Sequence, residues 1–143
     1  MLYISSKELI EINPKLLNLP KLETLNLSQC SISEFQFPIS FVSPLTDLNL
    51  GKNSLIEMPK NLSSCRDLES LYLADNGISM MTPELLDLKK LKRLNLDRNQ
   101  LSLLPDFVES LTQLSVLSID GNNFSSEEKE RIQKRYNIWF TPF

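Results

Sequence analysis

Apolar residues recur along the chain with a period of 23 residues, and each period opens with the pattern Leu-x-x-Leu-x-Leu-x-x-Asn-x-Leu, in which x is mostly polar. The second apolar position of this pattern falls at residues 2, 25, 48, 71, 94 and 117, without an insertion or a deletion. A proline follows later in the period, at positions 14, 38, 59, 83 and 105. A fixed period that covers nearly the whole chain predicts a stack of similar structural units.

The leucine-rich half of each unit is predicted to be a short β-strand. Residues two apart point to the same face of a strand, so Leu25 and Leu27 should point inward and Asn26, between them, outward. One unit cannot bury its apolar face alone, whereas stacked units bury it together. On the return limb the prolines limit regular structure, so we expect short 3₁₀ or single-turn helical pieces there, with the best helical pattern at residues 83–88.

The residue that follows each strand segment should turn the chain. An asparagine side chain carries both donors and an acceptor, so inside the coil it can bond the main chain of its own loop and of a neighbouring loop. We predict a structural ladder of four asparagines: Asn53, Asn76, Asn99 and Asn122. Cys30 takes this position in the second unit, where a small thiol tolerates burial, and Lys7 breaks the ladder in the first unit.

These repeats resemble the leucine-rich repeat family, and most closely its class with 23-residue units, whose pattern residues 91–113 follow almost letter for letter. The segment 122–140 is similar to the tails of bacterial members, those of spirochaetes in particular. The resemblance implies an α/β fold: a right-handed solenoid with a parallel β-sheet on the concave face, short 3₁₀ or helical segments on the convex face and a C-terminal capping helix. We expect one domain, residues 1–143, with repeats near 1–21, 22–44, 45–67, 68–90, 91–113 and 114–124 and a cap at 125–143.

The C-terminal segment carries a signal for the start of a helix. Ser125, followed three residues later by Glu128, is typical of a capping box. It predicts a helix over residues 126–136, in which Ile132 and Tyr136 are four apart and can pack inward together.

The leucine period continues once more beyond this helix. Phe140 falls 23 residues after position 117, so a short final strand is expected at residues 137–140. Pro142 would then deny the exposed strand edge a backbone donor. Trp139 is expected to pack against the capping helix, and the alternative is that it forms a binding hot spot.

The N-terminal end carries no comparable stop, because the repeat pattern begins at Leu2 without a preceding helix or hairpin. The first strand edge is therefore expected to be uncapped. Three explanations stay open: the chain is a fragment, its edge pairs with another chain, or residues 1–9 fold over the edge. Pairing through this edge would make the protein a homo-oligomer.

Composition narrows the classes of function. The formal net charge is −3, histidine is absent, and acidic residues flank the densest basic group at residues 89–93, so no nucleic-acid partner is expected. No stretch approaches the roughly 20 apolar residues of a membrane helix, and residues 1–10 lack a secretory signal. We expect a soluble protein without a membrane span, and the compartment stays open between the cytoplasm and export without a visible signal. Cys30 and Cys65 should be buried, unpaired thiols.

The concave strands carry the usual binding surface of the family that the repeats resemble. Tyrosine and arginine are common in binding hot spots. We therefore expect a binding centre at the middle of this face, formed by Asn49, Tyr72, Arg93, Asn95 and Arg98. The alternative is that these are solvated strand residues. Six strands offer a flat area of only about 400 Å², against about 800 Å² per partner in a standard interface, so binding should also use the adjacent loops or be weak.

Two acidic residues, Asp97 and Asp120, occupy the same position in neighbouring units. Adjacent strands lie about 4.8 Å apart, so the two carboxylates could hold a calcium ion if further oxygen ligands were near. The preferred interpretation is that Arg98 balances their charge.

The sequence therefore predicts a module that binds another protein, with host interaction by a bacterial protein as its specific form. The alternative is a structural or self-associating repeat fragment with no separate ligand. An enzyme is not expected, because the chain has no Ser/His/Asp set, no Cys/His pair and no phosphate-binding loop. No cofactor is expected either.

Overall fold

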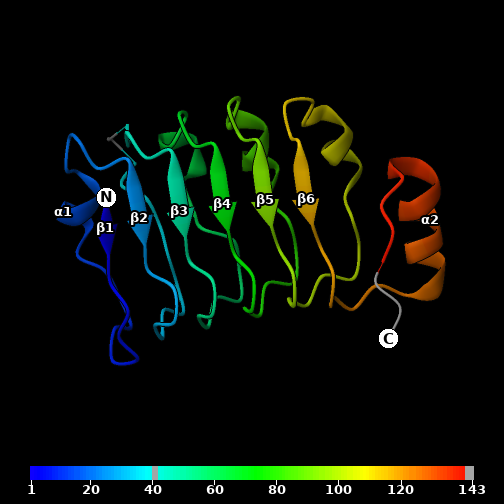
Figure 1. Ribbon diagram of the computed structural model, residues 1–143, viewed down its shortest axis with the longest axis horizontal. Coiled ribbons are helices and arrows are strands. Elements are labelled where there is room, and N and C mark those ends of the chain that lie inside the picture. The colour runs from blue at the N-terminus through cyan, green and yellow to red at the C-terminus, as the bar shows by residue number, and fades with distance from the viewer. Residues whose placement is uncertain (40–41, 141–143) are drawn as a thin grey trace.

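The computed structural model describes residues 1–39 and 42–140. In this part of the chain, six short parallel strands lie side by side in sequence order and form one sheet (Figure 1). Each strand comes from one 23-residue unit, which confirms the predicted solenoid with a parallel sheet. The strands are β1 (Leu2–Tyr3), β2 (Thr24–Asn26), β3 (Asp47–Asn49), β4 (Ser70–Tyr72), β5 (Arg93–Asn95) and β6 (Val116–Ser118).

Strand pairing keeps every unit in the same register. Leu25 of β2 lies opposite Leu48 of β3, which lies opposite Leu71 of β4, and the pattern continues through β5 and β6. The inward leucines therefore form continuous columns, and those of β2 to β5 are fully buried. Because burying a leucine side chain favours folding by about 1.5–3 kcal/mol, these columns supply much of the stabilising contact between units.

The return limbs carry short helical turns on one side of the sheet (Figure 1). They are α1 (Pro14–Leu17) and the 3₁₀ turns η1 (Leu62–Ser64), η2 (Pro83–Asp87) and η3 (Asp106–Ser110). Both α1 and η2 begin at a proline, whose restricted φ suits the first position of a helical turn. The predicted 3₁₀ and single-turn pieces are thereby confirmed.

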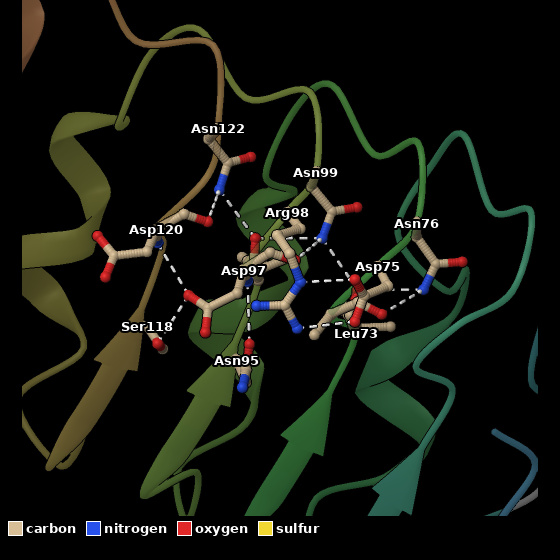
Figure 2. Close-up of polar contacts among 12 residues, drawn as sticks. Leu73, Asp75, Asn76, Asn95, Asp97, Arg98, Asn99, Ser118, Asp120 and Asn122 are labelled. Carbon is tan, nitrogen blue, oxygen red and sulfur yellow. Dashed lines mark hydrogen bonds and ion pairs between the residues drawn. The ribbon is translucent and has the colours of Figure 1, made fainter. Parts of the chain in front are cut away.

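Asparagine side chains join adjacent units just beyond the strands (Figure 2). Nδ2 of Asn99 donates to the carbonyl oxygen of Leu73 in the preceding unit at 2.9 Å and to that of Leu96 in its own unit at 3.1 Å. Its Oδ1 accepts a hydrogen bond from the main-chain N of Ile78 at 3.0 Å. The same pattern of contacts recurs at Asn53, Asn76 and Asn122. These bonds satisfy main-chain groups that the loops would otherwise leave unpaired.

The first two units have other residues at the ladder position. Sγ of Cys30 lies 3.8 Å from the carbonyl oxygen of Ile4 in the first unit. Lys7 contributes its main-chain carbonyl, which accepts a hydrogen bond from Oγ of Ser31 at 2.7 Å. Cys30 and Cys65 are buried, free thiols as predicted, and burial raises the pKa of Cys65 to about 12.

Helix α2 (Ser126–Tyr136) stands beyond β6 at the C-terminal end of the coil (Figure 1). Its bounds confirm the predicted capping helix, and Oγ of Ser125 accepts a hydrogen bond from N of Glu128 at 3.1 Å. Ile132 is fully buried and Tyr136 packs against the core, also as predicted. In a capping box, the carboxylate of Glu128 would accept a hydrogen bond from the main-chain N of Ser125. Here it accepts one from the main-chain N of Leu104 in the preceding repeat instead.

The predicted final strand at residues 137–140 is wrong, since these residues adopt no strand. Asn137 ends the helix in a left-handed conformation, with φ of 56°. The chain is redirected at this point and does not extend the sheet. Phe140 still packs inward, with its ring centroid 5.7 Å from that of Phe124.

Two further expectations concern this end of the chain. Trp139 is 71% exposed, so the expectation that it packs against the capping helix is wrong. Its Nε1 donates to Oδ1 of Asn137 at 3.3 Å. Pro142, which was expected to protect the edge of the final strand, lies outside the described residues.

Ion pairs hold α2 against the convex turn of the preceding repeat. Arg131 pairs with Asp106 of η3 at 3.2 Å and with Glu128 at 2.7 Å. Arg135 pairs with Asp106 at 2.6 Å and also with Glu109. The guanidinium of Arg131 holds the pKa of Glu128 below its ordinary value, and Arg135 does the same for the pKa of Glu109. The contact between cap and coil therefore depends on ionised carboxylates.

Replacement of a buried ladder residue tests its contribution to stability. Asn99 is 1% exposed, and Asn99→Ala should lower the free energy of unfolding by about 2–4 kcal/mol, because the N–H of Ile78 and carbonyls of two units lose their partner. The neighbouring exposed Gln100 provides a matched control, since Gln100→Ala should change the same quantity by less than about 0.5 kcal/mol. Urea unfolding followed by circular dichroism measures both, and equal losses would contradict the role given to the ladder.

The cap makes stability depend on pH. A carboxyl whose pKa is lowered in the folded state stabilises the fold above its unfolded pKa, and this contribution is lost as pH falls below 4.5, the ordinary value for Glu128. Glu128→Gln keeps an acceptor for N of Leu104 but not the charge. It should be less stable than the native chain at pH 7, with a difference that shrinks between pH 5 and pH 3 (about the range of carboxyl titration).

Urea unfolding across this pH range measures the effect, with Glu130→Gln as the control. Glu130 lies on the same helix with a side chain that is 67% exposed, so its replacement should leave the pH profile nearly unchanged. A stability difference for Glu128→Gln that stays constant with pH would show that the charge of Glu128 does not hold the cap.

Candidate functional site on the concave face

The concave side of the sheet presents the residues that stand between the paired leucines. Strand pairing places Asn49, Tyr72 and Asn95 opposite one another on β3, β4 and β5. All three side chains are partly exposed. A tyrosine therefore stands between two asparagines near the middle of the sheet, with about 4.8 Å between neighbouring strands.

Each of these asparagines is oriented by a bond to its own loop. Oδ1 of Asn49 accepts from N of Gly51 at 2.9 Å, and Oδ1 of Asn95 accepts from N of Asp97 at 2.9 Å. Such a side-chain to main-chain bond two residues on is an Asx turn. Within residues 1–39 and 42–140, no group accepts a hydrogen bond from Nδ2 of Asn49 or Asn95. The turn therefore leaves the donor end of both amides available to a ligand.

These side chains line one shallow hollow of about 270 Å³. Its walls contain three of the five residues predicted to form the binding centre, Asn49, Tyr72 and Asn95. Lys52 and Asp75 also line the hollow, although they were not among the residues predicted to form the binding centre. Their position in the sequence could have indicated that they belong to the site. Each residue directly precedes a ladder asparagine, in the turn that follows the strand. The remaining lining residues are Ser28, Gln29, Gly51 and Ala74.

The two predicted arginines lie outside the lining of the hollow. Nε of Arg93 donates to Oγ of Ser70 on β4 at 3.0 Å. Arg98 forms a two-pronged ion pair with Asp75, with distances of 2.6 and 2.8 Å (Figure 2). This contact holds the pKa of Asp75 below its ordinary value. Arg98 therefore neutralises an acidic residue of the hollow.

Arg98 forms its ion pair with Asp75, and the charge of Asp97 also helps to raise the pKa of Arg98, so the predicted charge balance at Asp97 and Asp120 stays a prediction. Oδ1 of Asp97 accepts from Oγ of Ser118 at 2.7 Å and from the main-chain N of Asp120 at 2.8 Å (Figure 2). Asp97 thus links β5 to the loop after β6. Across the described ranges, no group of three or more acidic, cysteine or histidine side chains is arranged so that it could hold a metal ion.

In the second to sixth units, the residue before the ladder position has a left-handed backbone. These residues are Gln29, Lys52, Asp75, Arg98 and Gly121, with φ between 51° and 69°. Residues other than glycine seldom adopt this conformation. Two members of the row, Lys52 and Asp75, line the hollow, so the strained turn shapes its rim.

Gly121 provides a test of this backbone constraint. A Cβ atom at this position would lie 2.8 Å from Cγ and 3.4 Å from Cα of Arg98, at a φ of 69°. Gly121→Ala should therefore lower the free energy of unfolding by about 1–2 kcal/mol. Gly77→Ala is the control, because other units carry a side chain at this position and the change should stay within about 0.5 kcal/mol. Thermal unfolding compares the two variants, and an equal effect would show that the left-handed turn is not constrained.

Comparison with known proteins agrees with this geometry. A family model described as leucine rich repeat matches residues 66–124, and a second leucine-rich repeat model matches residues 21–42. The chain belongs to the leucine-rich repeat family. Proteins of this family are typically non-enzymatic modules that mediate protein–protein interaction. A comparison with curated proteins found no match.

Solved leucine-rich repeat structures share this coil. A leucine-rich repeat protein of Leptospira interrogans is 30% identical, with a TM-score of 0.69, and the match covers 94% of this chain and 41% of that one. The ectodomain of the receptor kinase SOBIR1 from Arabidopsis thaliana is 28% identical, with a TM-score of 0.60 and coverage of 79% and 63%. An internalin of Listeria monocytogenes shares the fold at 24% identity, with a TM-score of 0.61 and coverage of 91% and 44%. This leucine-rich repeat chain thus spans less than two thirds of each of these structures.

None of the helices in the described part of the chain has the length and apolar character needed to cross a membrane.

Proposed function

We propose that this leucine-rich repeat chain binds another protein through the concave hollow and the loops beside it. Asn49, Tyr72, Arg93, Asn95 and Arg98 contribute to the binding surface. The observation that carries the proposal is that three of these residues, from three neighbouring strands, line one hollow. The proposal extends the general role of the family to named residues of this chain.

The chemistry of the hollow suits a polypeptide ligand. Tyr72 offers an aromatic face and a hydroxyl group, which is a common combination in binding hot spots. The amide donors of Asn49 and Asn95 stand on either side of it and can bond carbonyl oxygens of a bound segment. Asp75, paired with Arg98, adds a polar rim without a large net charge.

The size of the hollow limits how much binding it can supply alone. At about 270 Å³ it can accept a side chain or two of a partner, whereas a standard interface covers about 800 Å² on each side. Arg93 and Arg98 lie beside the hollow, on β5 and in the loop that follows it, and contact Ser70 of β4 and Asp75 of the loop after β4. We infer that the loops after β3, β4 and β5 take part in the contact.

The similarity to a Leptospira protein supports a bacterial origin for the chain. A host protein is then one class of partner, and bacterial surface or cytoplasmic proteins are another. Experiments should therefore sample extracts of both kinds.

Self-association is the second candidate, and one observation favours it. Among the described strands, β1 is paired on one side only, with β2. An unpaired strand edge can pair with another chain, and Tyr3 of β1 is more than half exposed. Sedimentation velocity tests this candidate, since a monomer at high protein concentration would exclude it.

The concave site is tested by an affinity pull-down from host and bacterial extracts with the native chain and with Tyr72→Ala/Arg93→Glu. The double variant removes the aromatic side chain from the hollow and reverses a charge beside it. A partner held through this face should be lost, because removal of a hot-spot residue costs about 2 kcal/mol or more of binding free energy. Mass spectrometry identifies the retained proteins, and circular dichroism checks that both chains are folded.

A matched control changes another aromatic residue and another arginine elsewhere on the chain. Trp139→Ala/Arg66→Glu deletes an exposed aromatic side chain and reverses an exposed arginine away from the hollow. This control should keep the partner. If both double variants capture the same proteins as the native chain, the concave face is not the binding site.

A further inference from the structure

The return side of the coil carries a second groove, which the concave proposal does not use. Three hollows follow one another there, with volumes of about 690, 110 and 360 Å³. The first two share residues 33–35, the second and third share residues 56–58, and Lys60 lines all three. The hollows therefore form one continuous groove along the first four units. We call the surface formed by their lining residues the return groove.

One wall of the return groove is a row of carboxylates. Glu11, Glu34 and Glu57 occupy the same position in three successive units, and all three are exposed. Lys60 is the only basic lining residue, and it pairs with Glu57 at 3.2 Å with both side chains more than half exposed. In the part of the chain that the structure describes, Glu11 and Glu34 have no ion-pair partner. The row therefore carries a net negative charge.

The carboxylates do not converge on one point. Over the described ranges, no three acidic side chains come close enough together to form a metal-binding group. A single bound cation therefore does not account for the row. Separate positive charges, one for each unit, fit its geometry.

Part of the groove lining is apolar. Phe35 and Met58 are buried in its floor at equivalent positions of the second and third units. At the far end of the groove Ile56 is 66% exposed and Met80 is 76% exposed. Met80 occupies the position that carries a glutamate in the first three units, so the row changes from acidic to apolar along the coil.

We propose that the return groove binds an extended basic segment of another polypeptide chain, with lysine or arginine side chains on Glu11, Glu34 and Glu57 and an apolar side chain on Met80. Alternate residues of an extended chain point the same way and are about 6.6 Å apart. The units lie about 4.8 Å apart in the sheet and farther apart on the return side, because the sheet lies on the inside of the curve. Lysine and arginine also bury apolar stems while the charged end stays in water, which suits a groove with an apolar floor and an acidic wall.

Synthetic peptides test the proposal without knowledge of the natural partner. The probes are fluorescent peptides of sequence Lys-Ser-Lys-Ser-Lys-Ser-Leu-Ser-Leu and its reverse, measured by fluorescence anisotropy at physiological salt. The control peptides carry glutamate in place of lysine, or serine in place of leucine. At least one probe should bind, the glutamate peptides should not bind, and the all-serine versions should bind more weakly.

Variants of the protein locate the binding site. Glu34→Lys should weaken probe binding by about fivefold or more, since it removes one ion pair and adds repulsion. Glu23→Lys makes the same charge change at an exposed position outside the groove and should have much less effect. Met80→Ser should weaken binding of the probe but not of its all-serine version. Circular dichroism confirms that each variant is folded.

The concave and return surfaces can be distinguished in the same assay. Tyr72→Ala/Arg93→Glu should bind the probe as the native chain does, because neither residue lines the return groove. Equal weakening by Glu34→Lys and Glu23→Lys would show nonspecific attraction and would overturn the proposal. It would also be overturned if neither probe bound or if the concave double variant lost the probe. None of these results would bear on partner binding at the concave face.

Discussion

The ladder asparagines hold each unit from the third to the sixth at a set distance and orientation relative to the unit before it. Their amide groups donate to carbonyl oxygens of two units and accept from the main chain of the unit before. A loop that turns inward without such a partner would bury unsatisfied peptide groups, at about 1–3 kcal/mol each. The columns of buried leucines supply apolar contact, but apolar contact has little directional preference. The amide bonds therefore reinforce the register that strand pairing gives, and every surface feature of the coil depends on that register.

A constant register turns each outward position of the repeat into a row on the surface. On the concave face, one such row places Tyr72 between Asn49 and Asn95 and so forms the lining of the hollow. On the return side, another row aligns glutamates of three successive units along a groove. Both surfaces arise from the same spacing, although they differ in shape and charge. A repeat protein can thus present two surfaces of different shape and charge from one scaffold, each lined in part by residues that contribute little to the core.

The features that could be predicted from the sequence are those that depend on the period or on a local signal for a helix start. The leucine spacing indicated the strands, the prolines indicated the short turns, and Ser125 indicated the start of the capping helix. The predictions that failed or stay open concern side-chain partners and chain direction, which the period does not determine. Arg98 had acidic neighbours in three units, and side-chain geometry rather than sequence distance selected Asp75. The strand expected at 137–140 is absent because the left-handed turn at Asn137 redirects the chain. The return groove could not be predicted, because residue spacing does not indicate where the folded surface is hollow.

The most direct test of the concave site is photo-crosslinking from inside the hollow. A photoreactive phenylalanine analogue would replace Tyr72 in one sample and Arg66, on the exposed surface elsewhere, in another. After illumination in host and bacterial extracts, mass spectrometry would identify the crosslinked proteins. A specific partner joined to position 72 and absent from position 66 is the predicted result. The same proteins crosslinked at both positions, or none at position 72, would contradict the account.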